Sequence, residues 1–429
     1  MSTAPTELGA AALAALADER ITAAERALPQ RAAGLPVAEF LASEPRLEEF
    51  WTPLFALDGD AIARNAAVIQ GWATERGFEL MPHGKTTMAP ALWQRQLAAG
   101  ASGLTFATMG QVRTARSFGA ARIMLANAAV DARSLRWLAG ELADEGFAFL
   151  AWADGPGTVE AMERALDGVA LPRPVDVAVD LGALGGRTGV RDPEAALELA
   201  RRIAASPVLR LAGTAGYEGS LGHDRSPAAL DAVRGYLDAL VRLHEGVAGI
   251  AERTGDDPAG LVLTAGGSAY LDLVAAALEP LAARARVIVR SGASLLHDDG
   301  FYHGISPLDD ALAPAMRGYA RVVSHPEPGL ALLDGGKRDF PYDEGLPVPF
   351  AVAAELGADE RPLDAAVTAL NDQHAYLRAP GGAALDVREG EVVRLGLSHP
   401  CTAFDKWRFI PVVEHAHSTR VVELVRTFF

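Results

Sequence analysis

Short hydrophobic runs alternate with amphipathic stretches over the central part of this chain. The runs are apolar along most of their length and begin near residues 78, 103, 122, 147, 175, 209, 261 and 286. Helical spacing of apolar residues lies between them, as in 110–118, 134–145, 193–204 and 230–252. Strands that are apolar throughout are typical of a parallel sheet buried on both faces. Eight strand–helix units in about 230 residues predict a (β/α)8 TIM-type barrel, with an open doubly wound sheet as the alternative.

The pattern changes on both sides of this region. After about residue 318, short strands separated by glycine- and proline-containing turns predict a mostly antiparallel β domain over 319–429. Residues 1–45 are rich in alanine and leucine and predict an N-terminal helical extension. The barrel is assigned to 52–318, although we expect the strand at 52–58 to join the β domain.

Composition narrows the classes of function. The net charge of −16 argues against nucleic acid or an anionic membrane as a partner, because both bind basic surfaces. No apolar run reaches the roughly 18 residues of a membrane span. The single cysteine, Cys401, excludes an intrachain disulfide and favours a reducing, cytoplasmic location.

Candidate chemistry collects where the predicted barrel strands end, which is where barrel active sites lie. The first strand is followed by Pro82–His83–Gly84–Lys85. A desolvated lysine loses its proton readily and becomes a nucleophile for an aldehyde, so Lys85 is a candidate Schiff-base lysine. The alternative is an ordinary surface lysine at the start of a loop.

Small residues follow the last two predicted barrel strands. Loops at these positions form the usual phosphate site of a barrel, because small residues let backbone N–H groups approach an anion closely. Ordinary turn chemistry is the alternative. A phosphate cradle beside a strand-end lysine suggests pyridoxal phosphate. The candidate cradle residues are Gly266, Gly267, Ser268, Ser291, Gly292 and Ala293.

Five further side chains are candidates for binding or proton transfer. Arg187, in a glycine-rich loop, suits a ring nitrogen or a carboxylate, or it stabilises its own loop. Tyr217 and His223 suit acid–base work, with a structural role open for either one. His399 and Cys401 are expected on the same side of an extended strand, and imidazole with thiolate suits zinc.

Together these residues make the chain resemble the D-threonine aldolase and D-serine dehydratase family. These are fold-type III pyridoxal-phosphate enzymes with the architecture of alanine racemase, and the resemblance includes a bacterial amino acid deaminase branch. It extends from about residue 52 to the C-terminus. The motifs that carry it are Pro82–His83–X–Lys85–Thr86, Arg187–Thr188–Gly189–Val190, Tyr217–Glu218–Gly219, Gly266–Gly267–Ser268, Asn371–Asp372–Gln373–His374 and His399–X–Cys401.

The resemblance implies roles for these residues. Lys85 would form the Schiff base and Arg187 would lie beside the pyridine nitrogen, while the small residues after the last two strands would hold the phosphate. His399 and Cys401 would bind a divalent metal, zinc or else manganese or magnesium, beside the substrate's β-hydroxyl. Lys85 or His223 would take the α-proton. A homodimer is also implied, with a small D-amino acid as the substrate.

Several activities stay open at this stage. The His-X-Cys pair resembles zinc-dependent D-serine dehydratases, whereas some aldolase members have His-X-Asp. We therefore expect elimination of water and ammonia from a D-3-hydroxy amino acid, which gives a 2-keto acid. The alternatives are retro-aldol cleavage to glycine and an aldehyde, racemisation, and a cofactor-binding protein without catalytic activity.

Overall fold

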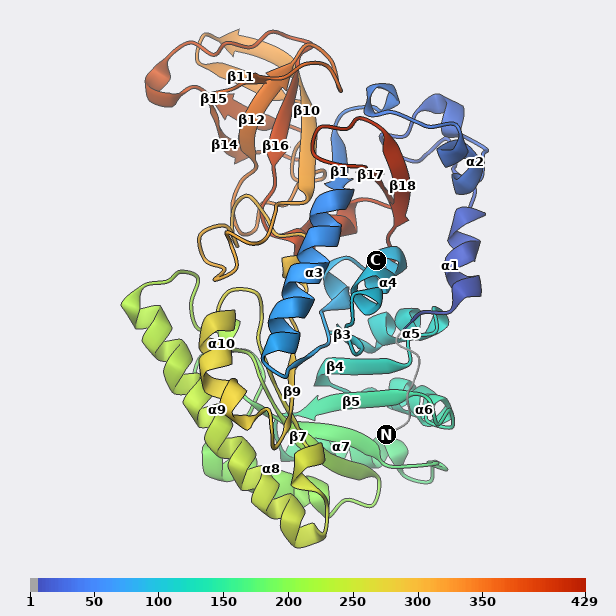
Figure 1. The fold of residues 1–429 in the computed structure, drawn as a ribbon, viewed down its shortest axis with the longest axis vertical. Helices are drawn as coiled ribbons and strands as arrows, with labels where there is room; N and C mark the ends of the chain where they lie inside the picture. The colour runs from blue at the N-terminus through green and yellow to red at the C-terminus, as the bar shows by residue number, and fades with distance from the viewer. Residues whose placement is uncertain (1–6) are drawn as a thin grey trace.

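The computed structural model describes residues 7–429, and two sheet-based units lie along its long axis (Figure 1). The lower unit in this view is built on a parallel sheet, and the upper unit on a larger, mostly antiparallel one. The parallel strands are β2 Glu79–Leu80, β3 Leu104–Phe106, β4 Arg122–Ala128, β5 Ala148–Ala153, β6 Val175–Leu181, β7 Leu209–Gly216, β8 Val262–Ala265 and β9 Arg286–Val289.

The parallel sheet closes on itself. Within residues 7–429 its eight strands run in the order β2-β9-β8-β7-β6-β5-β4-β3. A parallel bridge between His83 and Thr105 joins the two ends of this path. There, the Thr105 N–H donates to the carbonyl of Pro82 at 2.9 Å, and the Ser102 N–H donates to that of Leu80 at 2.8 Å. The predicted barrel is confirmed, and the open doubly wound sheet is wrong.

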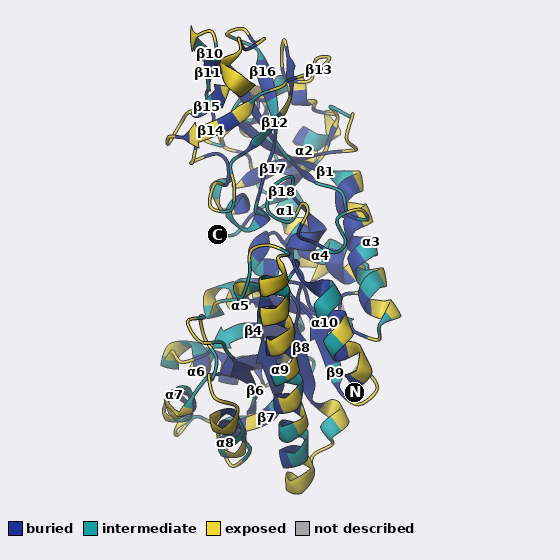
Figure 2. Cartoon of the chain, turned by 90° about the vertical axis from the view of Figure 1, so that its left-hand side faces the viewer, coloured by how far each residue is buried: buried dark blue, intermediate teal, exposed yellow. Residues whose placement is uncertain are grey.

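Helices cover the outside of the barrel, and their starts follow from capping residues. Asp192 and Ser226 accept backbone N–H bonds at the starts of α8 and α9, each with proline at the first helical position. Figure 2 shows buried strands behind α9, whose outer side is exposed. None of the helices in the described chain is long and apolar enough to cross a bilayer. The helices of this layer are α3 Gly59–Glu75, α4 Pro90–Ala98, α5 Met109–Ser117, α6 Ala132–Glu141, α7 Pro156–Leu166, α8 Pro193–Ala204, α9 Pro227–Thr254 and α10 Leu271–Leu278.

The first strand of the chain, β1 (Leu54–Asp58), lies in the larger sheet. It pairs antiparallel with β10 and parallel with β17, and the Asp58 carboxylate then caps α3 by accepting from the Ala61 N–H at 3.1 Å. From β1 the chain therefore passes out of the β domain into the barrel, and it returns at β10. The other strands here are β10 Met316–Glu327, β11 Leu330–Leu333, β12 Val348–Ala353, β13 Arg361–Pro362, β14 Ala366–Leu370, β15 Ala375–Arg378, β16 Val392–Gly396, β17 Phe409–Val413 and β18 Val421–Arg426.

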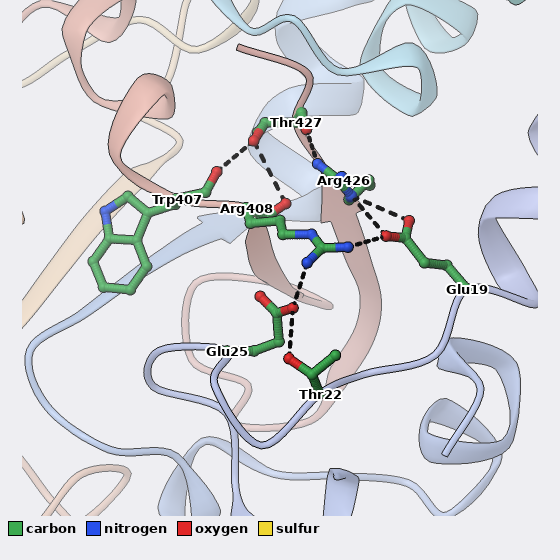
Figure 3. Close-up of polar contacts among 7 residues, drawn as sticks. All are labelled: Glu19, Thr22, Glu25, Trp407, Arg408, Arg426 and Thr427. Carbon is green, nitrogen blue, oxygen red and sulfur yellow. Dashed lines mark hydrogen bonds and ion pairs between the residues drawn. The ribbon is translucent and has the colours of Figure 1, made fainter. Parts of the chain in front are cut away.

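The N-terminal extension connects the two units. It contains α1 (Ala10–Ala17) and α2 (Val37–Ala42), while residues 1–6 of the predicted extension lie outside the described residues. The Gly9 N–H donates to the Phe118 carbonyl on the barrel at 2.8 Å. Figure 3 shows the other end, where the Glu19 carboxylate binds both Arg408 and Arg426.

Removing the Glu19 carboxylate should lower stability measurably. Glu19 and Arg426 are about three-quarters or more buried and are joined by bonds of 3.1 Å to both carboxylate oxygens. We expect Glu19→Ala to reduce the free energy of unfolding by about 1–2 kcal/mol, because the Arg426 guanidinium loses this carboxylate and Arg408 is left with Glu25 alone. The control is Glu44→Ala, whose pair with Arg420 is exposed and worth less than about 1 kcal/mol. Thermal unfolding of both variants checks this, and equal midpoints would contradict it.

Candidate active site

A cavity of about 540 Å³ lies at the C-terminal ends of the barrel strands, where the β domain meets the barrel. Side chains from both units line it, so neither unit forms the site alone. Gly266 and Ser291 are sequence neighbours of lining residues. The predicted site residues that line it directly are Lys85, Arg187, Tyr217, His223, Gly267, Ser268, Gly292, Ala293, His399 and Cys401.

Lys85 lies on a short 3-10 turn, Gly84–Thr86, directly after β2. A hydrogen bond from α4 fixes this turn, because the Trp93 indole N–H donates to the Gly84 carbonyl at 2.9 Å. A Cβ at position 84 would lie 2.6 Å from the Phe106 ring, so only glycine fits there. The chain has three lysines. Among the described residues Lys85 is the one that lines the cavity, while Lys337 and Lys406 lie near the Tyr342 ring.

Three buried polar atoms beside this cavity have no hydrogen-bond partner in residues 7–429. They are His83 Nδ1, Trp152 Nε1 and Arg290 Nε; the three residues line the cavity, and the atoms themselves are buried within its wall. Buried polar atoms are nearly always paired, so three unpaired ones around one cavity indicate a polar occupant. Burial, with the nearby charges of Lys85 and Arg290, holds the pKa of His83 well below its usual range. A neutral imidazole, an indole N–H and a guanidinium beside one lysine fit a phosphorylated aromatic aldehyde such as pyridoxal phosphate.

The loops after β8 and β9 fit a phosphate only in part. The Ser268 and Ser291 hydroxyls lie 2.7 Å apart, and a Cβ on Gly292 would lie 2.6 Å from the His83 carbonyl oxygen. These residues therefore offer hydroxyl groups and a closely approaching backbone. The Gly266 and Gly267 N–H groups were expected to bind the phosphate. Both instead donate to the Glu218 carboxylate, at 3.0 and 2.8 Å. They are not free to bind a phosphate.

Glu218 shapes this loop and was not identified from the sequence. Its side chain is fully buried. We expect Glu218→Ala to weaken cofactor binding about tenfold or more, because two backbone N–H groups lose their acceptor and the Gly266–Ser268 loop loses its shape. Glu218→Gln keeps one acceptor oxygen, so its dissociation constant for the cofactor should lie between those of Glu218→Ala and the parent protein. Titration of metal-loaded protein with pyridoxal phosphate measures this, and three equal dissociation constants would contradict it.

Arg187, the arginine predicted beside the pyridine nitrogen, lies at the exposed side of the cavity. Arg187 is exposed, and its guanidinium lies 4.7 Å from the centre of the Tyr217 ring. Arg290 is the fully buried arginine of this cavity; it donates to the Gly216 carbonyl at 2.6 Å and keeps Nε unpaired within the described residues. The sequence offered a signal for it, because Arg290 stands directly before Ser291 at the end of β9.

His399 and Cys401 lie together at the β-domain side of the cavity, but the expected extended strand is wrong. Strand β16 ends at Gly396, His399 has a left-handed backbone with φ of 42°, and Pro400–Thr402 form a 3-10 turn. Proline has no N–H and its fixed φ suits the first position of such a turn. The turn nevertheless brings the imidazole and the thiol into contact.

The charges around this pair suit a metal ion. His399 Nδ1 binds the Asp343 carboxylate at 2.7 Å, which leaves Nε2 for another ligand, and the Cys401 sulfur lies 3.4 Å from the Thr86 hydroxyl. Burial lowers the pKa of His399, but contact with Cys401 and the charge of Asp343 outweigh it and raise that pKa to about 9. Burial raises the pKa of Cys401, but His399 outweighs it and lowers that pKa. One nitrogen and one thiolate sulfur fit zinc. Sequence reasoning missed Asp343.

The remaining acid–base candidates differ in what they can do. Burial and the nearby Glu218 carboxylate raise the pKa of Tyr217 to about 12, so its hydroxyl stays protonated and can donate. His223 is exposed at the cavity, with its ring 6.3 Å from that of Phe301, which lies 6.1 Å from the His399 ring. Burial raises the pKa of Asp180 to about 6, which adds a further titratable group that sequence reasoning missed.

The barrel, the attached β domain and a lysine at the end of the first barrel strand define an alanine-racemase-like protein. The family model described as alanine racemase, N-terminal domain, matches residues 57–254, and the one described as putative serine dehydratase domain matches 315–413. Together the two matches take in more than half of the chain. The chain is thus similar to alanine racemases over its barrel and to serine dehydratases over its β domain, and its homologues are pyridoxal-phosphate-dependent lyases.

Characterised relatives and solved structures agree with this assignment. The chain is 29% identical to D-threonine aldolase of Arthrobacter sp. over 364 residues, which cover 82% of this chain and 86% of that one. It is 26% identical to D-threo-3-hydroxyaspartate dehydratase of Delftia sp. over 364 residues, 82% and 90% of the two chains. The structure of D-threonine aldolase from Filomicrobium marinum superposes with a TM-score of 0.74 at 22% identity, and covers 90% of this chain and 96% of that one.

Proposed function

We propose that this protein is a pyridoxal-phosphate- and divalent-metal-dependent lyase that eliminates water from a D-3-hydroxy amino acid. The enamine product then takes up one water as it hydrolyses, so the net products are a 2-keto acid and ammonia. The observation that carries the proposal is that Lys85 and the His399–Cys401 pair line one cavity, although they come from different units of the fold. A site with both groups can hold an amino acid by its amine and, at the same time, engage its β-oxygen.

The cofactor's aromatic ring, when bound, withdraws electrons from an attached amino acid and makes its α-proton more acidic. Lys85 would hold the cofactor. Its amine or the His223 imidazole would accept the α-proton. Arg290 is the partner we assign to the ring nitrogen in place of Arg187. A permanently charged guanidinium there disfavours protonation of that nitrogen, which weakens the ring as an electron acceptor and leaves a need for help with the leaving hydroxide.

His399 and Cys401 would hold a divalent metal ion, which would supply Lewis-acid help to the leaving hydroxide. Two protein ligands leave coordination positions for water and substrate. We assign zinc, because a thiolate is a poor ligand for magnesium or manganese. A structure of a D-threo-3-hydroxyaspartate dehydratase with a cysteine-to-alanine change is described as the metal-free form, and a second variant under the same enzyme name changes a histidine two positions earlier. This matches the spacing of His399 and Cys401.

The second candidate is retro-aldol cleavage of the same class of substrate to glycine and an aldehyde. The Arthrobacter D-threonine aldolase, at 29% identity, is the observation that favours it. The same metal would bind the β-oxygen, and a base would take its proton instead of the α-proton.

A substrate panel separates these functions. Zinc-loaded enzyme is incubated with the D and L forms of serine, threonine and 3-hydroxyaspartate, and keto acid, ammonia, glycine and aldehyde are measured. We expect keto acid and ammonia in equal amounts from D substrates only. Glycine with aldehyde would favour cleavage, and loss of optical activity without either product would favour racemisation and contradict the proposal.

We also propose the wider arrangement of the enzyme. The barrel (residues 52–318, apart from β1) and the β domain (319–429, with β1) act as one unit within a homodimer, and the helical extension (1–45) connects them. A reducing, cytoplasmic compartment keeps the Cys401 thiolate from oxidation. Light scattering at micromolar concentration tests the dimer, and a monomeric mass would contradict it.

A further inference from the structure

The segment that joins β9 to the β domain carries a second group of metal-binding side chains. His297, His303 and Asp309 offer one ligand atom each, and these atoms all lie within 4.8 Å of one another. None of the three lines the cavity described above. The spacing is regular, with five residues between successive members, so a single loop supplies the whole group.

The three side chains are held around one carboxylate. His297 Nε2 lies 2.7 Å from Asp309 Oδ1, and His303 Nδ1 lies 3.2 Å from the same carboxylate. The Gly304 N–H donates to Asp309 Oδ2 at 3.0 Å, which fixes the carboxylate's orientation. Two imidazole nitrogens therefore converge on one oriented carboxylate, which is a ligand set of the kind that binds zinc.

Exposure is graded across the group. The His297 side chain is 2% exposed, Asp309 24% and His303 67%. The buried histidine is held in a left-handed backbone with φ of 40°, a conformation that is costly for a residue with a side chain and that persists where surrounding contacts enforce it. One side of the group is thus rigid, and the other opens to solvent, where an ion can enter and water can complete its coordination.

We propose that His297, His303 and Asp309 form a second divalent-metal site of the zinc class, with His297 Nε2, His303 Nδ1 and the Asp309 carboxylate as ligands. A bound metal would replace the hydrogen bonds between these nitrogens and the carboxylate, and each imidazole would carry its proton on the other ring nitrogen. This site has nitrogen and oxygen ligands only, whereas the His399–Cys401 pair includes sulfur. The two sites are therefore distinguishable by the spectrum of a bound ion. The inference does not depend on the proposed function.

The position of the site gives it a structural role. The same loop carries Phe301 and Tyr302 into the lining of the active-site cavity. Asp298, the residue after His297, accepts a hydrogen bond from the Tyr302 N–H through its carboxylate at 2.9 Å. A metal that ties His297 to Asp309 closes the loop around this aromatic pair and fixes it against the cavity.

Metal analysis of full-length protein tests the proposal. Protein is saturated with zinc, desalted and analysed for metal per chain as the parent, as His303→Ala and as Cys401→Ala. We expect two ions in the parent and one in each variant. His303 is exposed, so its removal should leave the fold intact, and a control at another exposed histidine, His415→Ala, should keep both ions.

Cobalt substitution assigns the ion that each variant retains. Cobalt bound to a thiolate has a charge-transfer band in the near ultraviolet, which His303→Ala should keep and Cys401→Ala should lose. One ion in the parent that His303→Ala retains would overturn the proposal. One ion that His303→Ala loses and Cys401→Ala keeps would support this site and contradict the metal assignment in the proposed function instead.

Discussion

Replacing Lys85 with alanine should lower kcat/KM by about four orders of magnitude, because the enzyme loses both its attachment point for the cofactor and its nearest base. The variant should also lose the visible absorption of cofactor-loaded protein and the adduct that borohydride traps on a lysine. The chain allows an unusually clear test, since Lys85 is one of just three lysines.

Lys337→Ala and Lys406→Ala are the matched controls. Both side chains lie near the Tyr342 ring, and neither lines the cavity among the described residues. Each control should keep the trapped adduct, which peptide mapping should locate at Lys85. An adduct on Lys337 or Lys406 in the parent protein would show that the cofactor site is assigned to the wrong residue.

Replacing Cys401 with alanine should lower the rate of keto-acid formation by about two to four orders of magnitude, which is the second-largest effect that we expect. A Lewis acid at the leaving oxygen is worth several kcal/mol, and the variant has one remaining ligand, His399, for that ion. Cofactor binding should change little, because Lys85 and the β8 and β9 loops are unaltered.

Cys401→Asp separates ligand loss from packing loss. A carboxylate is also a metal ligand, so this variant should retain part of the metal and part of the activity, whereas the alanine variant should retain neither. If both variants lost metal and activity equally, the thiol's role would be in packing against Thr86 and not in coordination.

The sequence predicted the barrel well because its determinants are local. The strands from β2 to β9 lie in mostly apolar runs, and the helices between them have their own apolar spacing. Several also have a capping side chain, as Asp192 shows for α8. The convergence of Lys85, Tyr217 and Ser268 follows from the same pattern, since the carboxyl ends of all barrel strands meet at one rim.

The errors arose where contacts between distant segments decide the outcome. The Gly266 and Gly267 N–H groups are taken by Glu218, which is 48 residues away from Gly266 in sequence. Asp343 reaches His399 across 56 residues. No short motif records such pairs. The expected strand at His399 failed for a local reason, because Pro400 begins a 3-10 turn there.

The most direct test of the central claim, that one cavity joins Lys85 chemistry to a metal at His399 and Cys401, is a zinc titration of chelator-treated, cofactor-loaded His303→Ala enzyme. This variant isolates the active-site ion from the second site. We predict that keto-acid formation from a D-3-hydroxy amino acid rises from near zero in proportion to added zinc and levels off at one ion per chain. Full activity before zinc is added, or no response at saturation, would contradict the claim.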